Sequence, residues 1–414
     1  MSRVLVLGGG VIGAACAYYL NRADWEVEVV DQGAFGRGAS HANCGIVCPS
    51  HALPLAEPGT LWPTLKSLLQ KNSPFIIKPR LDLDLLDWLA RFAVRCNHHD
   101  MLRAGRAIVA LLQSSRALWD QLLRTEPLDC EWETRGLLYA YRTRAAFEAY
   151  AHTDQLLRAE FGLPARSFEG DDVCAFEPAL QTGLAGGWLY EGDAHLRPDR
   201  LLAGLRRVLA ARGVAIREQC AVRDFVSERG SATAVLTVEG ERLTADAFVV
   251  ATGAWTPLLN GALGCRLLIQ PGKGYSLTMP RPARCPSVPM ILVESRVAVT
   301  PMQSGYRLGS TMEFTGYDAT LNRARLQLLR DGAAQYLVEP TTEPVQEEWF
   351  GWRPMTPDSV PYIGFSPKLP NVLIAAGHNM LGVSMSPATG RLVAELLDGT
   401  TPHLDPEPYG LRGR

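Results

Sequence analysis

The chain has 414 residues, of which 47% are hydrophobic and 20% are charged, and its formal net charge is −2. This composition is that of a globular protein of two or three domains, and the lack of a basic surplus argues against nucleic-acid binding. The nine cysteines follow no disulfide framework, and no Cys/His cluster has metal-site spacing, so no metal is expected. No stretch reaches the roughly 20 apolar residues of a membrane span. We therefore expect a cytoplasmic protein, or one peripheral to the inner face of a membrane.

The N-terminus predicts a dinucleotide-binding unit. Residues 4–7 form a branched apolar run typical of a buried parallel strand, residues 8–13 fit G-x-G-x-x-G, and a second strand over 27–30 ends at Asp31. The three motif glycines allow a tight turn, a close approach to a pyrophosphate, and close packing of the following helix. Asp31 can accept hydrogen bonds from ribose hydroxyls. The candidate cofactor contacts are Gly8, Gly10, Val11, Ile12, Gly13, Asp31 and Gln32.

The next segment, residues 36–46, is rich in small residues. Gly38, Ser40, Asn43 and Gly45 fit a Gly-x-Ser-x-x-Asn-x-Gly pattern, and the segment resembles the D-amino-acid oxidase superfamily. In that family this loop lies along the pyrophosphate and the flavin, so the resemblance implies FAD as the cofactor. The contacts that it implies here are Ser40, Asn43, Gly45 and Ile46.

Two features of this segment could suggest a redox-active cysteine pair and a covalent bond between histidine and FAD, and we expect neither. Cys44 and Cys48 lie closer in sequence than the redox pair of flavin disulfide reductases, and no second glycine motif for NAD(P)H follows. His41 is displaced by one residue from the position where some relatives attach FAD through histidine. We therefore expect FAD to be bound non-covalently.

A second segment also resembles the family. Residues 245–255 predict a strand that ends in Ala-Thr-Gly-Ala-Trp, like the late FAD-contacting strand of these enzymes. Residues 214–216 and 221–222 fall where the family has a strand pair on the adenine side. The alternative is an ordinary buried strand with a glycine turn. The implied contacts are Val222, Ala251, Thr252, Gly253 and Trp255.

Residues 352–364 carry a single arginine, Arg353, in a turn that two prolines hold rigid. An arginine fork binds a carboxylate through two parallel hydrogen bonds, which fixes a small amino acid in one orientation. Glycine and D-amino-acid oxidases have an Arg-Pro at the matching place, so the resemblance implies Arg353 as the substrate anchor. The alternative is a structural arginine paired with Asp358 or with a backbone carbonyl.

The C-terminal stretch predicts a strand over residues 371–376, a glycine turn and a helix opened by residues 387–390. A helix N-terminus favours negative charge, and in the family this helix points toward the flavin pyrimidine ring. The turn lacks the Gly-His-Gly-x-x-Gly form expected in D-alanine-type dehydrogenases and is closer to enzymes of hydroxyproline breakdown. His378 is a candidate catalytic residue or a core histidine. The implied flavin contacts are Gly377, His378, Gly382 and Thr389.

Residues 270–277 resemble bacterial D-amino-acid dehydrogenases, as do residues 75–80 and 88–92. Tyr275 is a third catalytic candidate, because its hydroxyl can reach the substrate, although a packing role is an equal alternative. Lys273 either faces the flavin or lies on the surface, and we favour the surface. His195 is given no catalytic role.

These segments predict an α/β fold with a Rossmann-like parallel sheet that binds FAD and a substrate domain with an antiparallel sheet and helices. The antiparallel sheet is expected from residues 135–142, 184–190 and 271–314, and helix over 81–125 with Leu85, Trp88, Leu89 and Phe92 on one stripe. The expected boundaries are 1–50, 190–260 and 350–414 for a discontinuous FAD domain, and 51–189 and 261–349 for the substrate domain.

The resemblance implies an FAD-dependent dehydrogenase that oxidises the C–N bond of small D-amino acids to imino and keto acids, by hydride transfer to flavin N5, in amino-acid catabolism. It favours a quinone or carrier protein over oxygen as the electron acceptor. Alternatives are a D-proline or cis-4-hydroxy-D-proline dehydrogenase of hydroxyproline degradation, a glycine or sarcosine oxidase, a nicotinamide enzyme without flavin, and a non-catalytic FAD-binding subunit. The sequence does not indicate the oligomeric state.

Overall fold

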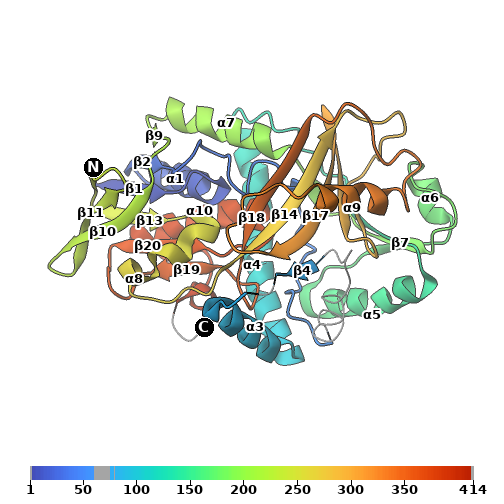
Figure 1. Ribbon diagram of the computed structural model, residues 1–414, viewed down its shortest axis with the longest axis horizontal. Helices are drawn as coiled ribbons and strands as arrows, with labels where there is room; N and C mark the ends of the chain where they lie inside the picture. Colours follow the sequence, from blue (N-terminus) through green and yellow to red (C-terminus); the bar gives the residue numbers. More distant parts are fainter. Residues whose placement is uncertain (1, 60–74, 79, 412–414) are drawn as a thin grey trace.

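The computed structural model describes residues 2–59, 75–78 and 80–411, so Pro79 of the 75–80 stretch lies outside the described residues. Two large sheets lie one beyond the other along the long axis of the molecule, with helices around them (Figure 1). The predicted α/β class with a parallel and a mostly antiparallel sheet is confirmed.

The first sheet is built from separated parts of the chain. In the described residues its order is β19-β20-β13-β1-β2-β9, with parallel pairing from β20 to β9 and an antiparallel edge strand, β19. The strands are β1 (Arg3–Leu7), β2 (Glu26–Val30), β9 (Ala215–Arg217), β13 (Ala247–Val250), β19 (Tyr362–Phe365) and β20 (Val372–Ala376).

Both faces of this sheet are covered, which explains why β1 reads as a continuous apolar run. Val4 and Val6 pack into the layer of helices α1 (Val11–Arg22), α4 (His98–Thr125), α7 (Pro198–Ala211) and α10 (Gly382–Leu397). Leu5 and Leu7 face the small sheet β10 (Val222–Glu228), β11 (Ser231–Thr237) and β12 (Arg242–Thr244). A Cβ at Gly390 of α10 would lie 2.6 Å from the backbone of Ala15, so α10 crosses α1 in direct contact.

The larger sheet has the order β18-β14-β17-β16-β15-β5-β7-β6 in the described chain, with β4 beside β17. It is mixed rather than purely antiparallel, because β15 pairs with β5, and β17 with β4, in parallel. The strands are β4 (Phe75–Ile77), β5 (Leu137–Tyr141), β6 (Arg166–Glu169), β7 (Gly186–Tyr190), β14 (Gln270–Met279), β15 (Met290–Leu292), β16 (Val297–Met302), β17 (Gly305–Phe314) and β18 (Glu347–Met355). β18 spans the predicted boundary at residue 350, and the domain boundaries stay a prediction.

The helical stretch predicted over 81–125 is two helices, α3 (Leu83–Arg95) and α4. Asn97 ends the continuity, because its side chain accepts a hydrogen bond from the Asp100 amide and so caps α4. The other elements are α5 (Arg144–Phe161), α6 (Asp172–Phe176), α8 (Asn260–Leu263), α9 (Arg323–Ala333), the short strands β3 (Ile46–Val47) and β8 (Ala194–His195), and the 3-10 turns η1 (Gly253–Leu259) and η2 (Glu407–Tyr409). None of the described helices is long and apolar enough to cross a membrane.

Candidate functional site

A cavity of about 1600 Å³ lies between the carboxyl ends of the parallel strands and one face of the larger sheet. This edge of a parallel sheet is where open α/β proteins bind their ligands. Three of the predicted contacts, Gly13, Gly377 and Thr389, are not part of its wall. The predicted residues in the wall are Gly8, Gly10, Val11, Ile12, Asp31, Gln32, Ser40, Asn43, Gly45, Ile46, Val222, Ala251, Thr252, Gly253, Trp255, Tyr275, Arg353, His378 and Gly382.

The glycine-rich turn has the close packing that a dinucleotide needs. Gly8 has a φ of +108°, and a Cβ on it would lie 2.5 Å from the Ala251 carbonyl oxygen. A Cβ on Gly13 would lie 1.8 Å from the Gly8 carbonyl oxygen, so Gly13 lets α1 approach the strand closely. Asp31 accepts from the amides of Gly9 and Gly33, both at 2.7 Å. These two bonds fix a carboxylate that has acceptor sites left for hydroxyl groups.

The loop after β2 joins this turn to the larger sheet. Ser40 Oγ accepts from the Val11 amide at 3.1 Å, at the N-terminus of α1. Asn43 closes the loop internally, since its side chain donates to the Ser40 carbonyl and accepts from the Gly45 amide. The loop therefore rests on the part of α1 where an anionic phosphate is favoured.

Other side chains of this segment are engaged away from the cavity or are unreactive. His41 is 2.7 Å from Glu347 and is not part of the cavity wall. Cys44 and Cys48 are free thiols, and burial raises the pKa of each thiol, which disfavours thiolate chemistry.

Lys273 of β14 was expected at the surface, and that expectation is wrong. Its ammonium is buried 4.6 Å from the Phe350 ring centre, outside the cavity wall.

The C-terminal helix begins earlier than the sequence indicated. α10 starts at Gly382 and contains Pro387, so the helix N-terminus that faces the cavity belongs to Gly382. Thr389 lies two turns further on, fully buried, and its hydroxyl is 3.0 Å from Nε2 of His378. Burial lowers the pKa of His378 to about 3, so its imidazole is neutral near pH 7.

Asn379 stands where the Gly-His-Gly-x-x-Gly form has its second glycine, and its conformation and bonds fit that position. It has a φ of +51°, a left-handed conformation that asparagine tolerates better than most residues. Its side chain accepts from the Thr356 amide and donates to the Thr356 hydroxyl and the Gly377 carbonyl. The asparagine thus ties the turn to the segment after β18, and its polar atoms are used within the protein.

Arg353 lies in β18 and not in the turn predicted around it. Its guanidinium lies flat over Gly274 of β14, where a Cβ would come within 2.3 Å of Nη1. Nη1 donates to the Thr311 carbonyl at 2.7 Å. This bond agrees in part with the alternative of a structural arginine paired with a backbone carbonyl. Burial lowers the pKa of Arg353, and among the described residues no carboxylate, Asp358 included, forms an ion pair with it. The remaining donors can receive a carboxylate from the cavity.

Tyr275 uses its hydroxyl inside the protein. The hydroxyl donates to Glu313 at 2.7 Å, the ring belongs to the core under the larger sheet, and burial together with this carboxylate raises the pKa of Tyr275. The packing alternative fits this geometry better than the catalytic one, which stays a prediction.

Several cavity residues were missed or given another role by the sequence. Trp88, Leu89 and Phe92 of α3 were assigned to a core, and they also line the cavity. Tyr139 and Tyr141 alternate along β5 and face the same cavity with Tyr150 of α5. In the sequence, the spacing of the two tyrosines by two residues indicates that they share one face of a strand. The spacing does not indicate that this face meets a cavity.

The glycine turn, the carboxylate of Asp31 and the loop on the N-terminus of α1 fit FAD, and together they define a flavin-dependent oxidoreductase. The chain belongs to the family described as FAD dependent oxidoreductase (DAO), whose model matches residues 3–396.

Relatives and solved structures agree with this membership. The chain is 35% identical to a D-amino acid dehydrogenase of Methylobacterium nodulans over 97% of this chain and 96% of the relative. It is 34% identical to one of Xanthobacter autotrophicus, over 97% of both. Glycine oxidase of Geobacillus kaustophilus has the same fold with a TM-score of 0.81, at 24% identity over the whole of both chains. L-proline dehydrogenase of P. horikoshii gives 0.71 at 20% identity, over 99% of this chain and 97% of that one.

The pKa of His378 predicts a pH dependence of stability. Between its folded value of about 3 and its ordinary value of 6.5, the unfolded chain binds a proton that the folded protein does not. Stability therefore falls as the pH falls through this window. His378→Gln keeps a polar partner for Thr389 and should lose this component. Guanidinium unfolding of both proteins at pH 7 and pH 5 measures it, and a pH-independent difference between them would contradict the assignment.

Proposed function

We propose that this protein is an FAD-dependent dehydrogenase of small D-amino acids, which converts the amino acid to an imino acid that water hydrolyses to a keto acid. Arg353 carries the proposal, because it is a partly buried cation in the cavity wall, with no carboxylate paired with it among the described residues. Two full-length relatives named D-amino acid dehydrogenase support the substrate class.

The side chains of the cavity orient the substrate more than they exchange protons with it. Bound FAD supplies the two-electron acceptor for the hydride of the substrate α-carbon. Arg353 holds the carboxylate, and such fixed geometry is worth several powers of ten in rate. With a pKa of about 3, His378 is too weak a base to take a proton near neutral pH, and Tyr275 keeps its proton in the hydrogen bond to Glu313. The substrate ammonium can lose its proton to water.

The N-terminus of α10 is the second element of the mechanism. Gly382 and Val383, at its start, line the cavity, and the first amides of a helix carry the positive end of its dipole. Oriented amides stabilise negative charge that develops during a reaction, without the cost of reorienting water. We assign to Gly382 the stabilisation that was expected in part from Thr389.

The cyclic-amine alternative loses one of its supports. Its motif, the asparagine in place of glycine at position 379, is accounted for by bonds to Thr356 and Gly377 within the protein. Glycine oxidase shares the fold, so a glycine or sarcosine oxidase remains the second candidate.

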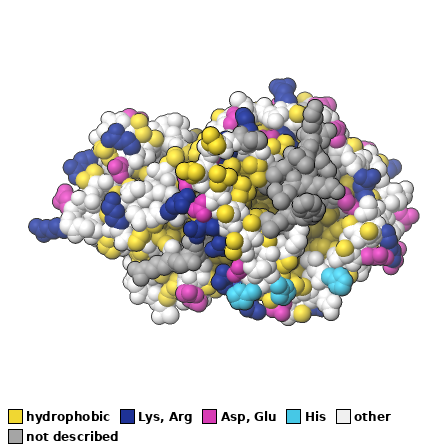
Figure 2. Space-filling model, turned by 60° about the horizontal axis from the view of Figure 1, so that its bottom comes forward, with side chains coloured by type: hydrophobic (Ala, Val, Ile, Leu, Met, Phe, Trp, Pro, Cys, Tyr) yellow, Lys and Arg dark blue, Asp and Glu magenta, His cyan; other side chains and the backbone are white. Residues whose placement is uncertain are grey.

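We also propose a quinone or carrier protein as the electron acceptor, with the protein resting on a membrane surface. Leu81, two residues before α3, is 105% exposed, and Leu83 and Leu86 of α3 are 82% and 54% exposed. Trp88 and Phe92 on the same helix line the cavity. Figure 2 shows the face obtained by turning the lower side of Figure 1 forward, where hydrophobic side chains gather beside basic ones. A lipid surface can cover such leucines.

Anaerobic flavin bleaching tests the function. The purified holoenzyme is mixed in turn with D-alanine, D-proline, cis-4-hydroxy-D-proline, their L forms, glycine and sarcosine. We expect bleaching by D forms, fastest with the physiological class of substrate. Bleaching by none of them, with FAD bound, would contradict the proposal and favour a non-catalytic FAD-binding subunit.

Arg353→Lys tests the substrate anchor. Loss of the bidentate hydrogen bonds should raise the dissociation constant of the D-amino acid by roughly 10- to 100-fold in a bleaching titration, as expected for charged hydrogen bonds. Gly274→Ala should act in the same direction, because its Cβ displaces the guanidinium. Gly261→Ala is the control, since its Cβ meets open space. Unchanged substrate affinity in both test variants would exclude Arg353 as the anchor.

Vesicle co-sedimentation tests the membrane surface. The double substitution of Leu81 and Leu83 by serine should reduce binding to anionic phospholipid vesicles about tenfold or more, because each leucine contributes about 1.5 kcal/mol or more on burial. Val338→Ser, which changes another exposed apolar side chain, should leave binding unchanged. Equal binding of all three proteins would remove α3 as the contact.

A further inference from the structure

Three consecutive carbonyl groups of the loop after β2 are held by three adjacent strands of the larger sheet. The strands lie in the order β14, β17, β16, and each sends one side chain to the next carbonyl of residues 42–44. The loop therefore crosses the strands, one residue per strand. The bonds run from Ser276 Oγ to Ala42 O (2.7 Å), from Arg307 Nη1 to Asn43 O (2.8 Å) and from Thr300 Oγ1 to Cys44 O (2.6 Å).

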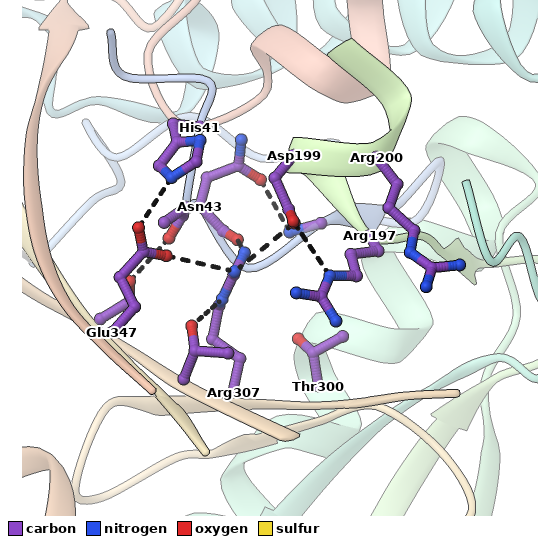
Figure 3. Close-up of polar contacts among 12 residues, drawn as sticks. His41, Asn43, Arg197, Asp199, Arg200, Thr300, Arg307 and Glu347 are labelled. Carbon is purple, nitrogen blue, oxygen red and sulfur yellow. Dashed lines mark hydrogen bonds and ion pairs between the residues drawn. The ribbon is translucent and has the colours of Figure 1, made fainter. Parts of the chain in front are cut away.

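The central donor is a buried cation. Arg307 is 1% exposed, and its Nε also donates to the Thr278 hydroxyl at 3.0 Å. Its Nη2 lies 3.8 Å from Asp199 and 3.9 Å from Glu347, distances longer than a hydrogen bond. The two carboxylates offset the buried charge, while the short contacts of Arg307 go to neutral oxygens (Figure 3). A buried charge is thus used to hold a backbone carbonyl.

The carboxylates of Glu347 and Asp199 are each held by a second side chain besides Arg307. Glu347 of β18 is bonded to His41, which belongs to the same loop, and Asp199 at the start of α7 accepts from Arg197 at 3.1 Å (Figure 3). Arg307 therefore sits at the centre of a network that joins the loop, β17, β18 and α7. Movement of any one of these elements would disturb the others.

The loop and the sheet are in direct contact, with no room between them. A Cβ on Gly309 of β17 would lie 2.5 Å from Sγ of Cys44. A Cβ on Gly45, whose φ is +65°, would lie 2.0 Å from the Leu196 carbonyl oxygen. The carbonyl bonds are therefore backed by close packing on both sides of the loop.

We propose that Arg307, assisted by Ser276 and Thr300, is a positioning residue that sets where the cofactor loop lies relative to Arg353. Strand β17 contacts both the loop and Arg353. Its Arg307 donates to the loop carbonyl of Asn43, and its Thr311 carbonyl accepts from Arg353. The inference rests on the proposed function, in which the loop contacts FAD and Arg353 holds the substrate. An error of about 1 Å between reacting groups costs on the order of 100-fold in rate.

Arg307→Met tests the proposal, because methionine fills much of the same space without donating a bond. We expect the dissociation constant of FAD, measured by titrating the apoprotein while following flavin fluorescence, to rise about tenfold or more. The limiting rate of flavin bleaching at saturating FAD and D-amino acid should fall by a similar factor. Arg307→Lys, which keeps a positively charged hydrogen-bond donor, should restore part of the FAD affinity.

Two milder variants keep the test open if Arg307→Met does not fold. Ser276→Ala and Thr300→Val each remove one carbonyl bond, and each should weaken FAD binding by roughly two- to tenfold. Glu177→Gln is the matched control. It perturbs a buried carboxylate that accepts from the Ser287 and Val288 amides, away from the cavity wall, so it should lower Tm without changing FAD affinity.

The outcomes separate failure of this inference from failure of the proposed function. Ser40→Ala removes the acceptor of the Val11 amide and should weaken FAD binding if the loop contacts the cofactor. If Ser40→Ala weakens binding while Arg307→Met and both milder variants change only Tm, as Glu177→Gln does, the positioning role is overturned. If no loop variant affects FAD affinity, the assignment of the loop to the cofactor fails first.

Discussion

The loop over residues 40–45 is held from two sides at once, and the shape of the cavity depends on that constraint. On one side Ser40 accepts the first amide of α1, and on the other side three strands donate to the loop carbonyls. A buried carbonyl or amide that loses its partner costs about 1–3 kcal/mol. The parallel sheet and the larger sheet are therefore coupled through a few backbone groups rather than through apolar packing alone.

The two arginines at this junction, the buried Arg307 and the partly buried Arg353, differ in how their charge is balanced. Arg307 has two carboxylates near it, Asp199 and Glu347, and is complete within the protein. Arg353 has a backbone carbonyl and, among the described residues, no carboxylate in ion-pair contact. A partly buried cation without a nearby anion is unfavourable until an anion binds, so the same physical chemistry that makes Arg307 structural makes Arg353 a receptor for an anionic group.

The sequence predicted the parts of the molecule that local pattern determines. The strand, glycine turn and acid at Asp31 predicted the parallel sheet, because each depends on residues close in the chain. The start of α10 was predicted too late, since Pro387 indicates a helix start although the buried helix tolerates it. The engagement of Tyr275 with Glu313 and the burial of Lys273 could not be predicted, because both depend on how distant strands align.

The close crossing of α1 and α10 has a consequence for how the protein is made. α1 begins at residue 11 and its partner helix at residue 382, and Gly390 meets Ala15 with no side chain between them. On a ribosome the face of α1 that meets α10 stays uncovered until the chain has been made beyond residue 382. Apolar surface beside the dinucleotide motif is thus exposed until the C-terminal helix is made, and chaperone binding or early cofactor capture would act on that intermediate.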